Sequence, residues 1–210
     1  MCHTWNIEAG SHILKPEAII MGSCILKEGF AHVWRMAITM YIIGITGGSG
    51  SGKGYTGSKF KNVQYIDCDK IYHNLLETDE ALNAELIKKF PAACNNGVLD
   101  RKILAGIVFA CKQQLNALNE ITHQYVIKEV VAQIGESKRE LCVIDAILLI
   151  QSGIAKKCDI VIGVIANLET RIERIIKRDG ITREAALLRI NNQEDDEFYI
   201  NNCDIIIYNE

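Results

Sequence analysis

A glycine-rich segment that directly follows an apolar run constrains the fold of this chain more than any other feature. Residues 47–53 read GGSGSGK, match the pattern GxxxxGK and come after the apolar run 41–45. Glycines allow successive peptide N–H groups to converge on one anion, and the start of the following helix adds a favourable dipole. The run, the spacing and the lysine together predict a P-loop for nucleotide phosphates rather than a flexible turn. The residues expected to bind the nucleotide are Gly48, Ser49, Gly50, Ser51, Gly52, Lys53 and Gly54.

Three positions concern a magnesium ion. Gly54 stands where the P-loop pattern has the Ser or Thr that ligates the metal. Because Mg2+ commonly keeps several waters, a water can replace that hydroxyl, and the pattern predicts weakened rather than abolished catalysis. Thr56 can substitute only if the helix start is shifted. Asp145 ends the apolar run 141–144 as a Walker B aspartate does and is predicted to hold Mg2+ through a water; the alternative is a carboxylate that caps a helix.

The remaining apolar runs predict an α/β fold. Short runs rich in Ile and Val, which suit a sheet buried on both faces, alternate with longer helical patterns. This alternation predicts a three-layer P-loop NTPase fold with a parallel five-stranded sheet. The predicted strands cover residues 41–45, 63–66, 141–144, 160–165 and 205–208.

Longer segments divide the chain further. The stretch 69–140 exceeds the length of a simple crossover helix and is expected to form a helical substrate-binding insertion. Residues 168–195 read as two helices, with Thr182 as the N-cap of the second, and are expected to form a mobile lid. Residues 1–39 carry no readable motif and are taken as an N-terminal extension of unknown role, so the core domain covers residues 40–210.

Charge and cysteine usage narrow the classes of partner and compartment. Lys and Arg total 23 against 26 Asp and Glu, and a net charge of -3 gives no reason to expect a nucleic-acid or membrane partner. The eight cysteines lie far apart, without the CxxC spacing of a zinc or redox site. No apolar segment approaches the roughly 18 to 20 residues that span a bilayer. Without a signal-peptide pattern, a reducing cytoplasm is the expected location.

Several ordered motifs over residues 42–209 resemble the dephospho-coenzyme A kinase family. The family loop GGxGSGK matches residues 47–53, its Asp-Ala-Asp signature matches the residues DCD at 67–69, and its Gly-x-Leu-Asp-Arg segment matches residues 97–101. Arg171, by contrast, stands where the family usually has glutamine. Further single matches are Leu118, Asn119, His123, Asp145, Leu148, Leu149, Arg174, Arg178, Arg189, Gln193 and Asn209.

The resemblance implies a P-loop kinase that uses ATP and Mg2+ to phosphorylate the 3′-hydroxyl of the small molecule dephospho-coenzyme A, the last step of coenzyme A biosynthesis. Asp69 is the implied general base, because a carboxylate can orient the hydroxyl and accept its proton. Lys53, Arg174 and Arg178 are the residues implied to act on the transferred phosphoryl group. The implied substrate contacts are Asp67, His73 and Arg101, and Asn209 is an implied nucleotide contact.

Some of these residues also fit structural roles. Asp67 and Asp69 could act as turn or N-cap residues at the end of a strand. Arg171, Arg174 and Arg178 share one helical face, where guanidinium groups can grip phosphate oxygens, but Arg171 fits a solvated helix face better.

Two other functions remain open for the whole chain. A uridine-type nucleoside kinase also carries a GGSGSGK loop after a strand. A nucleotide-binding or regulatory protein that has lost catalysis is the third hypothesis, and Gly54 is the residue that favours it.

Overall fold

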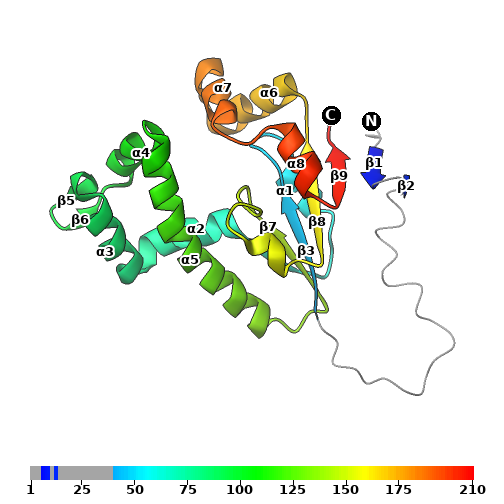
Figure 1. Ribbon diagram of the computed structural model, residues 1–210, viewed down its shortest axis with the longest axis horizontal. Helices are drawn as coiled ribbons and strands as arrows, with labels where there is room; N and C mark the ends of the chain where they lie inside the picture. Colours follow the sequence, from blue (N-terminus) through cyan, green and yellow to red (C-terminus); the bar gives the residue numbers. More distant parts are fainter. Residues whose placement is uncertain (1–5, 10–11, 14–39) are drawn as a thin grey trace. The chain divides into compact units, whose positions relative to one another are not determined.

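The computed structural model describes residues 6–9, 12–13 and 40–210, which form two compact units (Figure 1). The sheet unit contains the described parts of Met1–Ile66 and Lys138–Glu210, and the helical unit is Asp67–Ser137. Most of the predicted N-terminal extension lies outside the described residues.

The sheet unit carries the predicted strands and the helices around them. The described part of the extension contributes β1 (Asn6–Ala9) and β2 (His12–Ile13). The core elements are β3 (Tyr41–Thr46), α1 (Lys53–Gly57), β4 (Gln64–Asp67), β7 (Leu141–Asp145), η4 (Ile154–Lys157), β8 (Ile160–Ile165), α6 (Leu168–Asp179), α7 (Arg183–Asn191), α8 (Asp196–Asn202) and β9 (Ile205–Tyr208).

The strand order is β2-β1-β9-β8-β3-β7-β4. The strands β7, β3, β8 and β9 pair in parallel, and β1 adds to β9 in the antiparallel sense. With β4 at the far edge, the predicted parallel five-stranded α/β sheet is confirmed. Each of the five predicted strands is present, with bounds that differ by at most one residue. The strand β3, first of the five along the chain, lies at the centre of their order: β4 and β7 follow on one side, and the chain then crosses to β8 and β9 on the other.

Isoleucine and valine fill the core of this sheet. Ile45, Val143 and Val164 have no exposed surface, which fits β-branched side chains packed on both faces of a parallel sheet. The helix α1 contacts β3 and β7, and α8 contacts β8.

Two glycines of the sheet make room for cysteine side chains. A Cβ added at Gly44 would lie 2.8 Å from the sulfur of Cys158, and one added at Gly163 would lie 2.9 Å from that of Cys203. Burial raises the pKa of both thiols to about 12, and that of the fully buried Cys142 in β7 to about 11. The six described cysteines are free.

The α6–α7 hairpin follows β8. Asn167 caps α6 by accepting a hydrogen bond from Thr170 N–H, and Thr182 caps α7 by accepting one from Ala185 N–H. The predicted helix 168–179 and its successor are therefore confirmed as elements. Ile172, Ile175 and Ala186 are buried between the two helices and form their shared core.

The helical unit is built from helices and one short hairpin. Its core contains Leu82, Leu86 and Ala93, none of which is exposed. Asp67, Asp79 and Asp100 cap its first three helices with their carboxylates. The elements are α2 (Cys68–Thr78), α3 (Glu80–Lys89), η3 (Pro91–Ala93), β5 (Cys94–Asn95), β6 (Val98–Leu99), α4 (Arg101–Phe109) and α5 (Lys112–Glu136).

Among the described residues, no helix combines the length and the apolar character that crossing a membrane would require.

Candidate phosphate-binding site

The phosphate loop, residues 47–53, joins the end of β3 to the start of α1. Ile45 pairs with Asp145 in the β3–β7 register, so the carboxyl ends of the two central strands meet at this loop. Ligands of open parallel sheets bind at such a point, where the chain connections diverge.

Close approach and backbone conformation explain the glycines of the loop. Gly50 and Gly52 have φ angles of +79° and +97°, which side-chain-bearing residues rarely adopt. A Cβ at Gly50 would also lie 2.9 Å from the Cα of Arg171. The helix α1 begins at Lys53, and its first N–H groups have no acceptor within the helix. These donors are available to an anion.

The side chain of Lys53 reaches Asp145 at the end of β7. Their Nζ and Oδ1 atoms lie 3.2 Å apart, and the two side chains are only 11% and 10% exposed. Tyr65 of β4 donates its hydroxyl hydrogen to the other oxygen of Asp145 at 2.7 Å. A buried cation and a buried carboxylate therefore stand together at the foot of the loop, held by a tyrosine from a third strand.

Two side chains form hydrogen bonds with the N–H, the carbonyl and the hydroxyl oxygen of Ser49. Arg171 donates from Nε to the Ser49 carbonyl at 3.0 Å. Gln193 accepts from Ser49 N–H at 2.8 Å and donates from Nε2 to Ser49 Oγ at 2.8 Å. Within the loop, Ser51 N–H donates to the Gly48 carbonyl at 3.1 Å. The N–H groups of Ser49 and Ser51 thus already have protein acceptors. Fewer loop amides are therefore available to an anion than the glycine pattern alone predicts.

Arg171 is not on a solvated face, so that interpretation of its sequence position is wrong. Arg171 is 6% exposed, and its Nη1 atom lies 3.8 Å from Oδ1 of Asp196. Burial lowers the pKa of the guanidinium, and the Asp196 carboxylate partly opposes this shift. The pattern of helical spacing could not show that the first turn of α6 faces the phosphate loop.

Arg174 and Asn209 hold the next carbonyls of the loop. Arg174 Nη1 donates to the carbonyls of Gly50 and Ser51 at 3.3 Å each, and to that of Asn209 at 3.1 Å. The buried amide of Asn209 donates from Nδ2 to the Ser51 carbonyl at 2.8 Å. Both residues therefore contact the phosphate loop.

Arg178 has a different environment. Its Nε and Nη2 atoms donate to the two oxygens of Asp179 at 2.7 and 2.9 Å. Arg189 of α7 also donates to Asp179. Arg178 and Arg189 together lower the pKa of Asp179 to about 2, although its burial opposes them. Asp179 ties the end of α6 to α7, and Arg178 would have to leave it to reach a phosphate.

The residues near the loop allow a magnesium ion but supply few ligands. Near the loop, the buried hydroxyl oxygens of Ser51 and Thr56 lack a hydrogen-bond partner among the described residues, and Asp145 Oδ1 has only its ion pair with Lys53. The described residues contain no group of three or more His, Cys, Asp or Glu side chains arranged to hold a metal. A Cβ at Gly54 would meet nothing within 4 Å, and because α1 starts at Lys53 the helix start is not shifted toward Thr56. An ion here would take most ligands from phosphates and water, as Mg2+ commonly does.

The four other predicted site residues belong to the helical unit. Asp67 accepts from Lys70 N–H at 3.0 Å and pairs with Lys70 Nζ at 3.1 Å, which is the alternative N-cap role. Asp69 and His73 are exposed on α2, one helical turn apart. Arg101 pairs with Glu77 across 3.2 Å at the surface of the unit.

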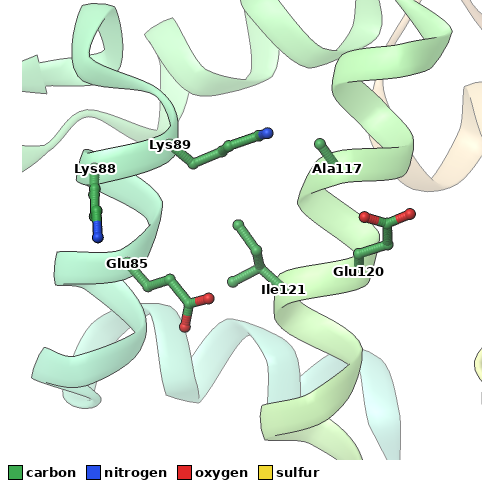
Figure 2. A pocket seen from close by; sticks show the side chains of 6 residues that line it. All are labelled: Glu85, Lys88, Lys89, Ala117, Glu120 and Ile121. Carbon is green, nitrogen blue, oxygen red and sulfur yellow. The ribbon is translucent and has the colours of Figure 1, made fainter.

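A hollow of about 390 Å³ lies between α3 and α5 in the helical unit (Figure 2). In Figure 2, Lys89 points across the hollow toward α5, whereas Lys88 points away from it along α3. Ile121 and Ala117 form its apolar part. Two lysines and two glutamates line it, so charge alone does not favour an anion there. The lining residues are Glu85, Lys88, Lys89, Ala117, Glu120 and Ile121.

Sequence reasoning missed Tyr65 as a site residue, and it named Gln193 as a family match without giving it a role in the site. Tyr65 lies 80 positions from its partner Asp145, and no local spacing signals such a contact. Gln193 lies in an irregular turn after α7, where only its match to a family motif distinguished it.

Comparisons with known proteins point to one family. The family model described as dephospho-CoA kinase matches residues 41–210. A dephospho-CoA kinase of Fusobacterium nucleatum is 39% identical over 178 residues, covering 82% of this chain and 91% of the relative. The one of Lactobacillus johnsonii is 36% identical and covers 73% of this chain and 81% of the relative.

Two solved structures extend the comparison to the fold. A crystal structure of a Thermus thermophilus protein superposes with a TM-score of 0.71 at 29% identity, covering 81% of this chain and 89% of that one. The dephospho-CoA kinase of Campylobacter jejuni gives a TM-score of 0.52 at 26% identity, covering 80% of this chain and 87% of that one.

Proposed function

Because the chain belongs to the dephospho-coenzyme A kinase family, we propose that it transfers the γ-phosphoryl group of ATP to the 3′-hydroxyl of dephospho-coenzyme A. The observation that carries the proposal is the buried pair of Lys53 and Asp145 beneath a glycine loop at the centre of the sheet. Such a pair places a cation for phosphates and a carboxylate for a metal at one point.

In the proposed reaction, the loop amides and Lys53 hold the β- and γ-phosphates. Phosphoryl transfer depends on positioning and on neutralising charge rather than on a covalent enzyme intermediate. Lys53 exchanges its contact with Asp145 for phosphate oxygens. Arg174 and Asn209 support the nucleotide side of the site, and Arg178 joins the phosphates after releasing Asp179.

The acceptor side of the proposed reaction depends on the helical unit. Asp69 accepts the proton of the 3′-hydroxyl as the new oxygen–phosphorus bond forms, and the bond between the γ-phosphorus and the bridging oxygen of ADP breaks. Asp67, His73 and Arg101 contribute to binding of dephospho-coenzyme A. This assignment makes residues 69–140 the substrate-binding insertion, and residues 168–195 the lid.

Mg2+ fits this proposal through Asp145. The carboxylate would hold the ion directly or through water, and the open space at Gly54 leaves room for a water in place of the missing hydroxyl. When bound, the ion neutralises charge on the β- and γ-phosphates. We place the protein in the cytoplasm, a reducing compartment that suits its six described free cysteines.

The family assignment does not favour a uridine-type kinase, and one assay separates it from the proposal. ATP consumption is followed with Mg2+ and either dephospho-coenzyme A or uridine, and the product is identified by its mass. We expect ADP to form only with dephospho-coenzyme A, and Lys53→Ala to abolish it. Turnover with uridine alone would refute the proposal. Nucleotide binding without turnover of either acceptor would favour a protein that has lost catalysis.

A further inference from the structure

Ser49 is held by both ends of the α6–α7 hairpin. Arg171 is the fourth residue of α6, and Gln193 lies two residues beyond α7. The two side chains also contact each other, because Arg171 Nη2 donates to Gln193 Oε1 at 3.4 Å. Ser49, Arg171 and Gln193 therefore close one ring of hydrogen bonds at the outside of the phosphate loop.

Burying Arg171 has a cost that its surroundings only partly offset. A guanidinium that leaves water needs hydrogen bonds and a nearby negative charge. Arg171 finds a carbonyl and an amide oxygen, while its acidic neighbour Asp196 is 48% exposed and 3.8 Å away. A positive charge held in this way lacks a full partner within the described residues, so it adds a positive potential to the adjacent loop.

The geometry of the peptide bond gives the contact a direction. The C=O of one residue and the N–H of the next lie in one plane and point in opposite directions. Because Arg171 holds the Ser49 carbonyl, the N–H of Gly50 points to the other side of the chain. Arg174 and Asn209 hold the Ser51 carbonyl, so the N–H of Gly52 is turned in the same manner. Protein side chains thus fix the carbonyls of Ser49 and Ser51, and the N–H groups of Gly50 and Gly52 point away from those side chains.

We propose that Arg171, acting with Gln193, is a positioning residue that presets the phosphate loop for ATP and places a buried positive charge behind it. The inference rests on the proposed function only for the identity of the anion. Preset donors need no reorganisation when the triphosphate arrives, which favours binding. The role is specific to arginine at this position, since lysine has no Nε–H donor on a planar fork and glutamine has no charge.

Four variants test this role. Arg171→Gln removes the charge, and Arg171→Lys keeps the charge and removes the fork. Gln193→Met removes both hydrogen bonds between Gln193 and Ser49, together with the one that Gln193 accepts from Arg171, but it keeps the Arg171 charge and its bond to the Ser49 carbonyl. Arg183→Gln is the matched control, because Arg183 lies on the same hairpin but is exposed and pairs with the exposed Glu169. ATP affinity is measured by calorimetry, and hydrogen exchange is measured on peptides covering residues 47–53 and β9.

Both Arg171 variants should raise the Kd for ATP roughly tenfold, because each loses a hydrogen bond from a charged donor. Exchange in residues 47–53 should become faster in the Arg171 variants and in Gln193→Met, with β9 unchanged. The Arg183→Gln variant should stay within about threefold of the wild-type Kd.

Two results overturn the inference. One is an unchanged Kd and unchanged loop exchange in the Arg171 variants, or in Gln193→Met if the Arg171 variants do not fold. The other is exchange that rises equally in β9, since that pattern identifies a general loss of stability. A wild-type protein that binds ATP without phosphorylating dephospho-coenzyme A defeats the proposed function and leaves this test intact.

Discussion

The substitution Gly54→Ser should restore a magnesium ligand that the phosphate loop lacks. Gly54 is the second residue of α1, its φ angle is not in the left-handed region, and an added Cβ meets nothing within 4 Å. A serine side chain therefore fits without moving a neighbour. If the hydroxyl ligates the ion, the gain in turnover should be at least about tenfold, or about 1.4 kcal/mol of activation free energy.

A second effect of the same substitution has to be separated from the first. Glycine destabilises a helix interior by about 1 kcal/mol relative to alanine, and serine lies between the two. Gly54→Ala therefore stabilises α1 at least as much as Gly54→Ser does, but it adds no hydroxyl. We expect the melting temperature to rise in both variants and the turnover to rise in the serine variant alone.

The assay is the initial rate of dephospho-coenzyme A phosphorylation, with Mg2+ varied at saturating substrates. The serine variant should reach half of its maximal rate at a lower Mg2+ concentration than the wild type. Equal gains in the serine and alanine variants would show that helix stability limits turnover. No gain in either would refute the idea that the missing hydroxyl limits the reaction.

Three further predictions concern single residues. Lys53→Met should lower kcat by about a hundredfold or more in the same assay, and it should lower the Tm because Asp145 loses its ion pair. Adding Asp145→Asn to this variant should recover the Tm but not the activity. Full activity of Lys53→Met would contradict the role assigned to Lys53. Arg178 and Arg189 keep the pKa of Asp179 at about 2, below its usual 3.8, so the carboxylate contributes stability above about pH 4 and loses it as the pH falls toward 2. Asp179→Asn should therefore lower the Tm at pH 7 but not near pH 2, and equal effects at both would disprove the linkage. Burial lowers the pKa of His123 below 6.5, so the unfolded chain binds the proton more readily and stability should fall as the pH drops below about 6.5. His123→Gln should flatten this part of the pH profile of the Tm, and an unchanged slope would assign the dependence to other groups.

The strands of the sheet unit were predictable because each depends on a short local pattern. Ile160–Ile165 is a run of β-branched residues interrupted only by Gly163, and such a run is buried wherever a parallel sheet places it. The α6–α7 hairpin was predictable for a similar reason, since Thr182 and Gly180 mark the turn within a few residues.

A short hairpin in the helical unit was missed although its signal is present. The stretch 69–140 was interpreted as mostly helical, and β5 and β6 interrupt it. Asn96 and Gly97 have φ angles of +50° and +81°, which are the angles of a tight hairpin turn. An Asn-Gly pair between two short strands is a strong local indication of such a turn.

Contacts between distant positions account for the rest of the missed site. Arg171 and Ser49 are 122 positions apart, and a helical spacing of charges gives no information on which face of a helix is covered. Tyr65 could be placed beside Asp145 only after the strand order was known, because β4 and β7 are separated by the whole helical unit.

The burial of Cys158 and Cys203 against glycines of the sheet has a practical consequence for fluorescent labelling. Maleimides react with thiolates, and the raised pKa of these two thiols and of Cys142 keeps them protonated at neutral pH. Cys111, between α4 and α5, is exposed. With Cys2 and Cys24 replaced, a fluorophore should therefore attach to the helical unit in preference to the sheet, and a change in its emission on adding dephospho-coenzyme A would test whether this unit responds to the substrate, while the native sheet cysteines stay in place.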